Sequence, residues 1–289
     1  MYEALSAPLP DAGAYLARIG LDPDDYRKSL RPELPASPSE YSAPRTKQAL
    51  DRLVNAHLHT VPFENLDVYE LRQVPSLATA DLFEKIVLRR RGGYCFELNA
   101  LFFALLQALG YACHPLAQRV VRLGPAPLNH RSTLVTLPDG TRLLCDVGYG
   151  GPTPVTALDL DKTGLQTSGA RTFRIFRDDR GAYHLQLVRP EGEQPILHFT
   201  DAPFDPMDFV PANFFAARHE GGRFRSLRVL SLIRPDGRVT MEGDTLRIRK
   251  NGTLTEATLS TAADRVAAYT GHFGMPPESV AVFAAERQA

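Results

Sequence analysis

The apolar pattern of this chain changes near Tyr111, and this change constrains the fold more than any other feature of the sequence. Before Tyr111, apolar residues recur at the spacing of amphipathic helices. Helices are expected over residues 11–19, 46–59, 80–90 and 96–109, with Thr79 as N-cap of the third. After Tyr111, short β-rich runs alternate with turn signals, which is typical of hairpins. The expected hairpins pair 132–137 with 141–147, 172–177 with 182–188, and 229–233 with 239–241.

The separation of helical and β-rich segments along the chain indicates an α+β fold. We expect a helical domain over 1–110, an antiparallel β domain over 111–213 and a smaller mixed domain over 214–289. Residues 22–44 are rich in proline, serine and charge, and are expected to form a surface connection. A last helix is expected to begin after Ser260 or Thr261, since either residue can act as its N-cap.

The charge of the chain is balanced, with 33 basic and 33 acidic residues. This balance gives no electrostatic reason to expect a nucleic acid or an anionic membrane as a partner. No apolar run approaches the ~18 residues that suggest a membrane span, and no signal-peptide pattern is present. The three cysteines (Cys95, Cys113 and Cys145) have no paired spacing, so we expect a reducing, cytoplasmic location. No metal-binding motif is recognisable, and no metal cofactor is expected.

Cys95 is the first candidate for chemistry. It follows the Gly92-Gly93 pair and is expected to lie in the first turn of the apolar helix 96–109. The unpaired N–H groups at a helix start favour an anion, and therefore the thiolate form of a cysteine. The competing interpretation is a small buried core residue, which is the more common role of a free cysteine. The two glycines favour the interpretation of Cys95 as a nucleophile.

The first hairpin contributes the second and third candidates. If the Pro-Asp-Gly turn at 138–140 is a three-residue loop with Gly140 at positive φ, Asp146 opposes Ser132. His130 and Asp146 are then diagonal neighbours on one sheet face, about 7–8 Å apart at Cα. A two-residue loop would instead place them on opposite faces.

These three residue types meet the needs of nucleophilic catalysis. A cysteine nucleophile needs a base that accepts its proton, and the base needs a partner that fixes its tautomer and orientation. Taken singly, His130 could be a loop residue and Asp146 a turn residue. Together with a cysteine at a helix start, they predict a Cys95–His130–Asp146 catalytic triad.

Four segments make the chain resemble the arylamine N-acetyltransferase family. They are Val-Pro-Phe-Glu-Asn-Leu-Asp at 61–67, Arg-Gly-Gly-Tyr-Cys-Phe-Glu at 91–97, His130 ahead of a strand, and Asp-Val-Gly-Tyr-Gly at 146–150. The resemblance implies a helical domain, an antiparallel β-barrel and a C-terminal α/β lid, with a papain-like Cys-His-Asp triad. It also implies a ping-pong reaction, in which acetyl-CoA acetylates the cysteine and an arylamine or hydrazine attacks the resulting thioester.

Further positions are carried over from the same resemblance. Phe63 and Tyr149 match residues that line the acceptor pocket, and Asn129 and Gly150 match positions near bound CoA. The resemblance also implies that Glu64 and Arg91 form an ion pair that braces the site. Tyr149 and Asn129 depart from the commoner family residues, and the 214–224 segment lacks the expected Ser-Pro pattern. These departures concern acceptor preference and CoA contacts, not the triad.

Three other functions remain open at the level of sequence. An amide synthase that closes a macrolactam would use the same triad, and so would a thiol hydrolase of the papain or transglutaminase type. The Asp-Val-Gly-Tyr-Gly segment disfavours the hydrolase. A non-enzymatic binding module with the same fold is disfavoured because all three triad residues are present.

Overall fold

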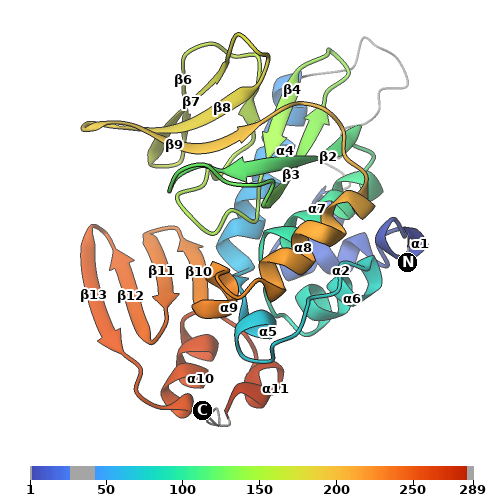
Figure 1. The fold of residues 1–289 in the computed structure, drawn as a ribbon. Coiled ribbons are helices and arrows are strands. Elements are labelled where there is room, and N and C mark those ends of the chain that lie inside the picture. The colour runs from blue at the N-terminus through green and yellow to red at the C-terminus, as the bar shows by residue number, and fades with distance from the viewer. Residues whose placement is uncertain (1, 27–42, 285–289) are drawn as a thin grey trace.

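The structure is a computed structural model that describes residues 2–26 and 43–284. Most of the connection predicted over 22–44 lies outside these residues. Three regions are visible in Figure 1: a group of helices, a large sheet above it, and a smaller sheet with two helices beneath it. The α+β fold class predicted from the sequence is confirmed by this arrangement.

The N-terminal region contains the predicted helices. Asp11 caps α2 by accepting a hydrogen bond from the Ala14 N–H (3.0 Å). The helices are α1 (Tyr2–Leu5), α2 (Ala12–Arg18), α3 (Pro23–Asp25), α4 (Ala43–Thr60), α5 (Leu66–Tyr69), α6 (Thr79–Phe83) and α7 (Cys95–Ala108).

The helix predicted over 80–90 differs from the prediction. Its N-cap is Ala78 rather than Thr79, and after Phe83 it continues as a π-helix, η3 (Glu84–Leu88). The Ser76 hydroxyl accepts the Ala78 N–H (3.2 Å) and donates to the Asp81 carboxylate (2.6 Å). These two hydrogen bonds order the residues just before Thr79, so the helix begins one residue earlier than the sequence predicts.

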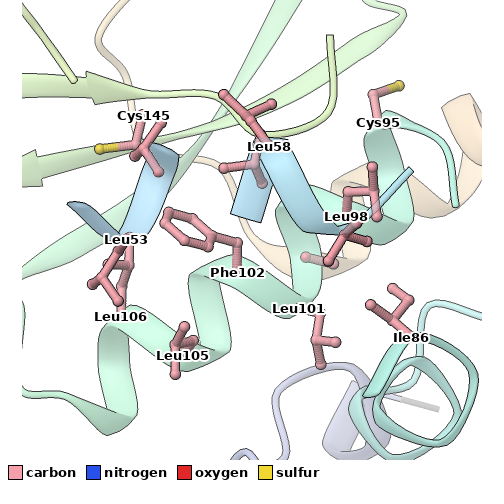
Figure 2. Packing of buried hydrophobic residues seen from close by; sticks show 14 of the residues in the cluster. Leu53, Leu58, Ile86, Cys95, Leu98, Leu101, Phe102, Leu105, Leu106 and Cys145 are labelled. Atoms are coloured by element: carbon pink, nitrogen blue, oxygen red, sulfur yellow. The ribbon is translucent and has the colours of Figure 1, made fainter. Parts of the chain in front are cut away.

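Helix α7 is the centre of the first hydrophobic core. Every residue from Cys95 to Leu106 is buried, which explains why the helix has no polar face. Leu53 and Leu58 of α4 and Ile86 of η3 pack against its leucines and Phe102 (Figure 2). The start of α7 is therefore held rigidly in the molecule.

An eight-stranded antiparallel sheet forms a nearly closed barrel above the helices (Figure 1). Its order is β5-β4-β3-β2-β9-β8-β7-β6. The outer strands β5 and β6 are joined by Gln166, whose side-chain amide accepts from the Asp159 N–H (2.9 Å) and donates to its carbonyl (2.7 Å). The strands are β2 (Cys113–Val120), β3 (His130–Thr136), β4 (Arg142–Cys145), β5 (Leu158–Asp159), β6 (Leu165–Ser168), β7 (Arg171–Arg177), β8 (Tyr183–Arg189) and β9 (Gly192–Phe199).

The C-terminal region is a second antiparallel sheet. Its order is β1-β10-β11-β12-β13, so β1 (Phe63–Glu64) joins it from the N-terminal region. Thr261 is confirmed as the N-cap of the last predicted helix, and it accepts the Asp264 N–H at 3.1 Å. The remaining elements are η4 (Pro206–Asp208), α8 (Phe209–Arg218), α9 (Arg223–Ser226), β10 (Val229–Arg234), β11 (Gly237–Glu242), β12 (Thr245–Lys250), β13 (Thr253–Thr258), α10 (Ala262–Gly271), α11 (Pro277–Val280) and η5 (Ala281–Phe283).

Two features connect the three regions. The predicted domain boundary at 213/214 falls inside α8, whose Phe209 and Ala217 belong to the first core, and β1 crosses to the C-terminal sheet. The boundaries themselves stay a prediction. Within residues 2–26 and 43–284, no helix combines the length and apolarity that a membrane crossing requires.

Candidate active site

Cys95 lies at the first position of α7, as the Gly-Gly turn predicts. The turn needs glycine because a Cβ on Gly92 would lie 2.0 Å from the Pro62 carbonyl oxygen. Glu97 secures the turn by accepting the Tyr94 N–H at 3.1 Å. In Figure 2 the Cys95 sulfur points away from Leu98 and the apolar cluster.

The hairpin that carries His130 and Asp146 has the predicted register. Thr133 pairs with Cys145, and Gly140 has a φ of +87°, as a three-residue turn requires. The His130 Nε2 lies 2.6 Å from an Asp146 carboxylate oxygen, and both side chains are buried. The structure therefore brings these two predicted residues together in a short, charge-assisted hydrogen bond.

The same hairpin meets the start of α7. A Cβ on Gly148 would lie 2.8 Å from the Cys95 Cα, so only glycine allows the chain after Asp146 to approach the helix this closely. The Cys95 sulfur lies 3.8 Å from the Asn129 carbonyl oxygen, next to His130. Thus Cys95, His130 and Asp146 occupy one buried site.

The electrostatics of the site favour a protonated imidazole. Burial lowers the pKa of His130, but the negative charge and hydrogen bond of Asp146, together with the Cys95 sulfur, outweigh it and raise that pKa from 6.5 to about 10. Because Asp146 occupies Nε2, the other ring nitrogen, Nδ1, is the one left for the thiol. This arrangement can support a thiolate–imidazolium pair.

Asn99 is a functional candidate that the sequence reasoning missed. Its side-chain amide donates to the Asp146 carboxylate (3.0 Å) and to the Arg131 carbonyl (2.5 Å), and its oxygen accepts the Val147 N–H (3.0 Å). It is fully buried, one turn after Cys95 on α7. Asn99 therefore ties the helix of the nucleophile to the strands of the acid–base pair. An amide within the otherwise apolar run 98–106 was the available signal.

We expect Asn99→Leu to lower kcat about 10²-fold, since Asp146 loses a bond that fixes its position. The variant should also lose about 1–3 kcal/mol of stability because the buried Val147 N–H becomes unpaired. Steady-state kinetics and urea denaturation measure the two effects. Asn55→Leu, at an exposed position of α4, is the matched control and should change neither. Unchanged kcat in Asn99→Leu would contradict the role in positioning.

Gln118 is a second residue that the sequence did not single out. It lies directly opposite His130 on β2 and is fully buried. Neither atom of its side-chain amide has a hydrogen-bond partner within the described part of the chain. Because an unpaired buried amide is unfavourable, this side chain is available to a polar group of a substrate beside the imidazole.

The two predicted substrate residues lie in different surroundings. The Tyr149 ring packs edge-on against His130, with centroids 5.8 Å apart. Phe63 and Gly150 line a small cavity of about 20 Å³, which has room for a water molecule and lies far below the ~300–1,000 Å³ of typical ligand pockets. The triad residues do not line this cavity. Tyr149 thus adjoins the triad, whereas Phe63 lies at a separate cavity.

The two positions carried over for CoA have structural roles. A Cβ on Gly150 would lie 2.8 Å from the Phe63 ring, so the space beside this glycine is filled by the protein itself. Its carbonyl accepts a hydrogen bond from Arg238 of β11. The Asn129 side chain accepts the Val120 N–H (2.9 Å) and closes the loop between β2 and β3. A contact of either residue with CoA stays a prediction.

The ion pair between Glu64 and Arg91 is present beneath the site. The Arg91 guanidinium donates to Glu64 at 2.6 and 2.9 Å and to Asp67 at 2.8 Å. Lys85 lies 2.6 Å from both Asp67 and Glu97, which extends the pair into a buried network. The network holds the 91–97 turn that carries Cys95.

Known proteins resemble this chain in both sequence and fold. An N-acetyltransferase family model matches residues 46–279. An arylamine N-acetyltransferase of Mycolicibacterium smegmatis is 33% identical over 273 residues, which is 92% of each chain. The solved structure of arylamine N-acetyltransferase from M. tuberculosis superposes with a TM-score of 0.81 at 32% identity, over 96% of this chain and 97% of that one.

Two other relatives are informative about the ligands and reactions that occur among similar proteins. The arylamine N-acetyltransferase of Mycobacterium marinum was solved in complex with CoA, and it matches with a TM-score of 0.79 at 29% identity over 95% of both chains. Proansamycin X synthase of Amycolatopsis mediterranei is 37% identical over 145 residues, which is 48% of this chain and 54% of the synthase. Because the family model covers most of the chain and a full-length relative is 33% identical, this protein belongs to the arylamine N-acetyltransferase family.

Proposed function

We propose that this acyltransferase transfers an acetyl group from acetyl-CoA to an arylamine or a hydrazine through an acetyl–Cys95 intermediate. The observation that carries the proposal is the convergence of the Cys95 thiol at a helix start with the buried His130–Asp146 pair. The names of its relatives and the CoA complex of one of them support the choice of donor and acceptor.

In the first half-reaction, the Cys95 thiolate attacks the thioester carbonyl of acetyl-CoA. The carbon–sulfur bond to CoA breaks, and CoA leaves as a thiolate that takes the proton held by His130. The N–H groups at the start of α7 and the dipole of that helix favour the negative charge that develops on the carbonyl oxygen. The products are free CoA and acetylated Cys95.

In the second half-reaction, the amine nitrogen attacks the acetyl–Cys95 carbonyl. Neutral His130 takes a proton from the nitrogen, the bond between carbon and Sγ breaks, and Cys95 returns to its thiolate form. Asp146 holds the imidazole in one tautomer and stabilises its charged form throughout. The Phe63 and Tyr149 rings provide apolar area for an aromatic acceptor.

Incubation with acetyl-CoA alone, followed by intact-protein mass spectrometry, tests the proposal. We expect one acetyl group per wild-type chain and none on Cys95→Ala. Cys113→Ala, which removes a half-buried thiol outside the site, is the matched control and should still be acetylated. Equal acetylation of Cys95→Ala would show that the assigned nucleophile is wrong.

A macrolactam-forming amide synthase is the second candidate, because proansamycin X synthase is among the relatives. Both functions use the same acyl–cysteine chemistry and differ in the acyl donor and the acceptor. Acetylated enzyme should be discharged by an arylamine and only slowly by water. Failure of acetyl-CoA to acylate Cys95, combined with acylation by a long-chain polyketide thioester, would favour the synthase. Rapid discharge to water would favour a thiol hydrolase.

A further inference from the structure

A cluster of metal-binding side chains lies on the outer wall of the barrel, away from the triad. It consists of Asp178, which follows β7, His184 of β8 and His198 of β9. One ligand atom from each lies within 4.8 Å of the others. His184 and His198 are directly opposed across the two strands, and their ring centroids are 4.7 Å apart.

Strand alternation places these side chains on the outside of the barrel. Tyr183, Leu185, Leu197 and Phe199, which flank the two histidines, belong to the barrel core. Since neighbouring residues of a strand point to opposite faces, both histidines point away from that core. All three candidate ligands are half-buried, so an ion has access from solvent.

Neighbouring groups hold the ligands in place. One Asp178 oxygen accepts the N–H groups of Arg180 (3.0 Å) and Ala182 (2.9 Å), and the other lies 2.9 Å from the His184 Nε2. The Phe176 ring stacks on His184, with centroids 4.9 Å apart and an interplanar angle of 5°. In metal sites, the side chains that bind the ion are typically held in position by such contacts with surrounding groups.

We propose that Asp178, His184 and His198 bind a divalent transition-metal ion of the zinc type. Two imidazoles and one carboxylate suit zinc, cobalt or nickel, whereas calcium and magnesium prefer oxygen ligands. Bonds of about 2.0–2.2 Å place tetrahedral ligands roughly 3.3 Å apart, so small side-chain rotations close the present spacing. A water molecule would complete the coordination.

The neighbouring positive charge, that of Arg119, leaves room for such an ion. Arg119 of β2 lies opposite His198 in the sheet, but its guanidinium donates to the Ala126 carbonyl at 2.8 Å. This bond directs the charge toward the loop after β2. A bound ion would link the β7–β8 turn to strands β8 and β9, and therefore stabilise the barrel wall without taking part in acyl transfer.

Cobalt titration of the Cys95→Ala variant tests this site. The substitution is needed because the thiol and imidazole of the active site are themselves potential metal ligands. We expect the visible absorption of four-coordinate Co²⁺ with one ion per chain, without the near-ultraviolet charge-transfer band that thiolate ligands produce. Added Zn²⁺ should displace the cobalt and raise the melting temperature.

His198→Gln in the same background should weaken cobalt binding at least ~10-fold and abolish the effect of zinc on the melting temperature. His219→Gln, at an exposed position of the sequence after α8, is the matched control and should bind as the parent does. Both variants should have the parental melting temperature in EDTA, which separates lost binding from lost folding. Equal binding by His198→Gln, a thiolate band, or no cobalt absorption at millimolar Co²⁺ would each overturn the proposal.

Discussion

Asp146→Asn is expected to lower kcat about 10⁴-fold while the fold stays intact. The asparagine amide can donate to His130 Nε2, and the imidazole would then carry its proton on the wrong nitrogen. The pKa of His130 should also fall from about 10, since Asp146 is the main group that raises it. Steady-state kinetics with a saturating arylamine measures the loss.

Alkylation by iodoacetamide separates this electrostatic effect from simple misfolding. With a weaker proton acceptor beside it, Cys95 should react more slowly near neutral pH, and its alkylation profile should move to higher pH. Asp159→Asn is the matched control, because that side chain accepts backbone N–H groups of a turn outside the site. A wild-type alkylation profile in Asp146→Asn would contradict the proposed role of the carboxylate.

The same pair makes stability depend on pH. Because the pKa of His130 is raised from 6.5 to about 10, its stabilising effect is complete below pH 6.5 and is lost as the pH rises through about 10. The difference in melting temperature between wild type and Asp146→Asn should therefore shrink across this range.

The sequence predicts best those parts of the site that depend on local chemistry. The hairpin of His130 and Asp146 has the predicted register because a Pro-Asp-Gly turn with Gly140 at positive φ leaves few alternatives. The start of α7 follows from Gly92 and Gly93 in the same way. In both cases, residues within one short segment decide the geometry.

The parts that depend on distant segments could not be predicted in this way. Asn99 contacts Asp146 only because two regions of the chain pack together. The histidines of the outer barrel wall meet through pairing of β8 with β9, and nothing in their spacing marks a metal site. Gly150 has a long-range neighbour of the same kind, because a Cβ at this position would lie 2.8 Å from the Phe63 ring.

The buried network beneath Cys95 is a further long-range feature, and Arg91→Met is expected to destabilise the protein by about 3–5 kcal/mol. Two buried carboxylates, Glu64 and Glu97, and the half-buried Asp67 face two cations among the described residues, Lys85 and Arg91. Burial raises the pKa of Glu97 to about 7, and the negative charges of Asp67 and Glu64 contribute to this rise. Lys85 acts in the opposite direction and lowers that pKa. The network thus already holds excess negative charge. Replacement of Arg91 by methionine would leave Lys85 as its single balancing cation.

Urea denaturation measures this loss, and two further variants identify its cause. Arg247→Met removes an exposed arginine that pairs with Glu256, and it should change the unfolding midpoint little. The double variant Arg91→Met/Glu64→Gln should recover part of the lost stability, because it removes the carboxylate that Arg91 neutralises. If the double variant were less stable than Arg91→Met by the full effect of Glu64→Gln alone, the two side chains would be energetically independent. The contact of the Arg91 guanidinium with the Phe283 ring would then explain the loss instead.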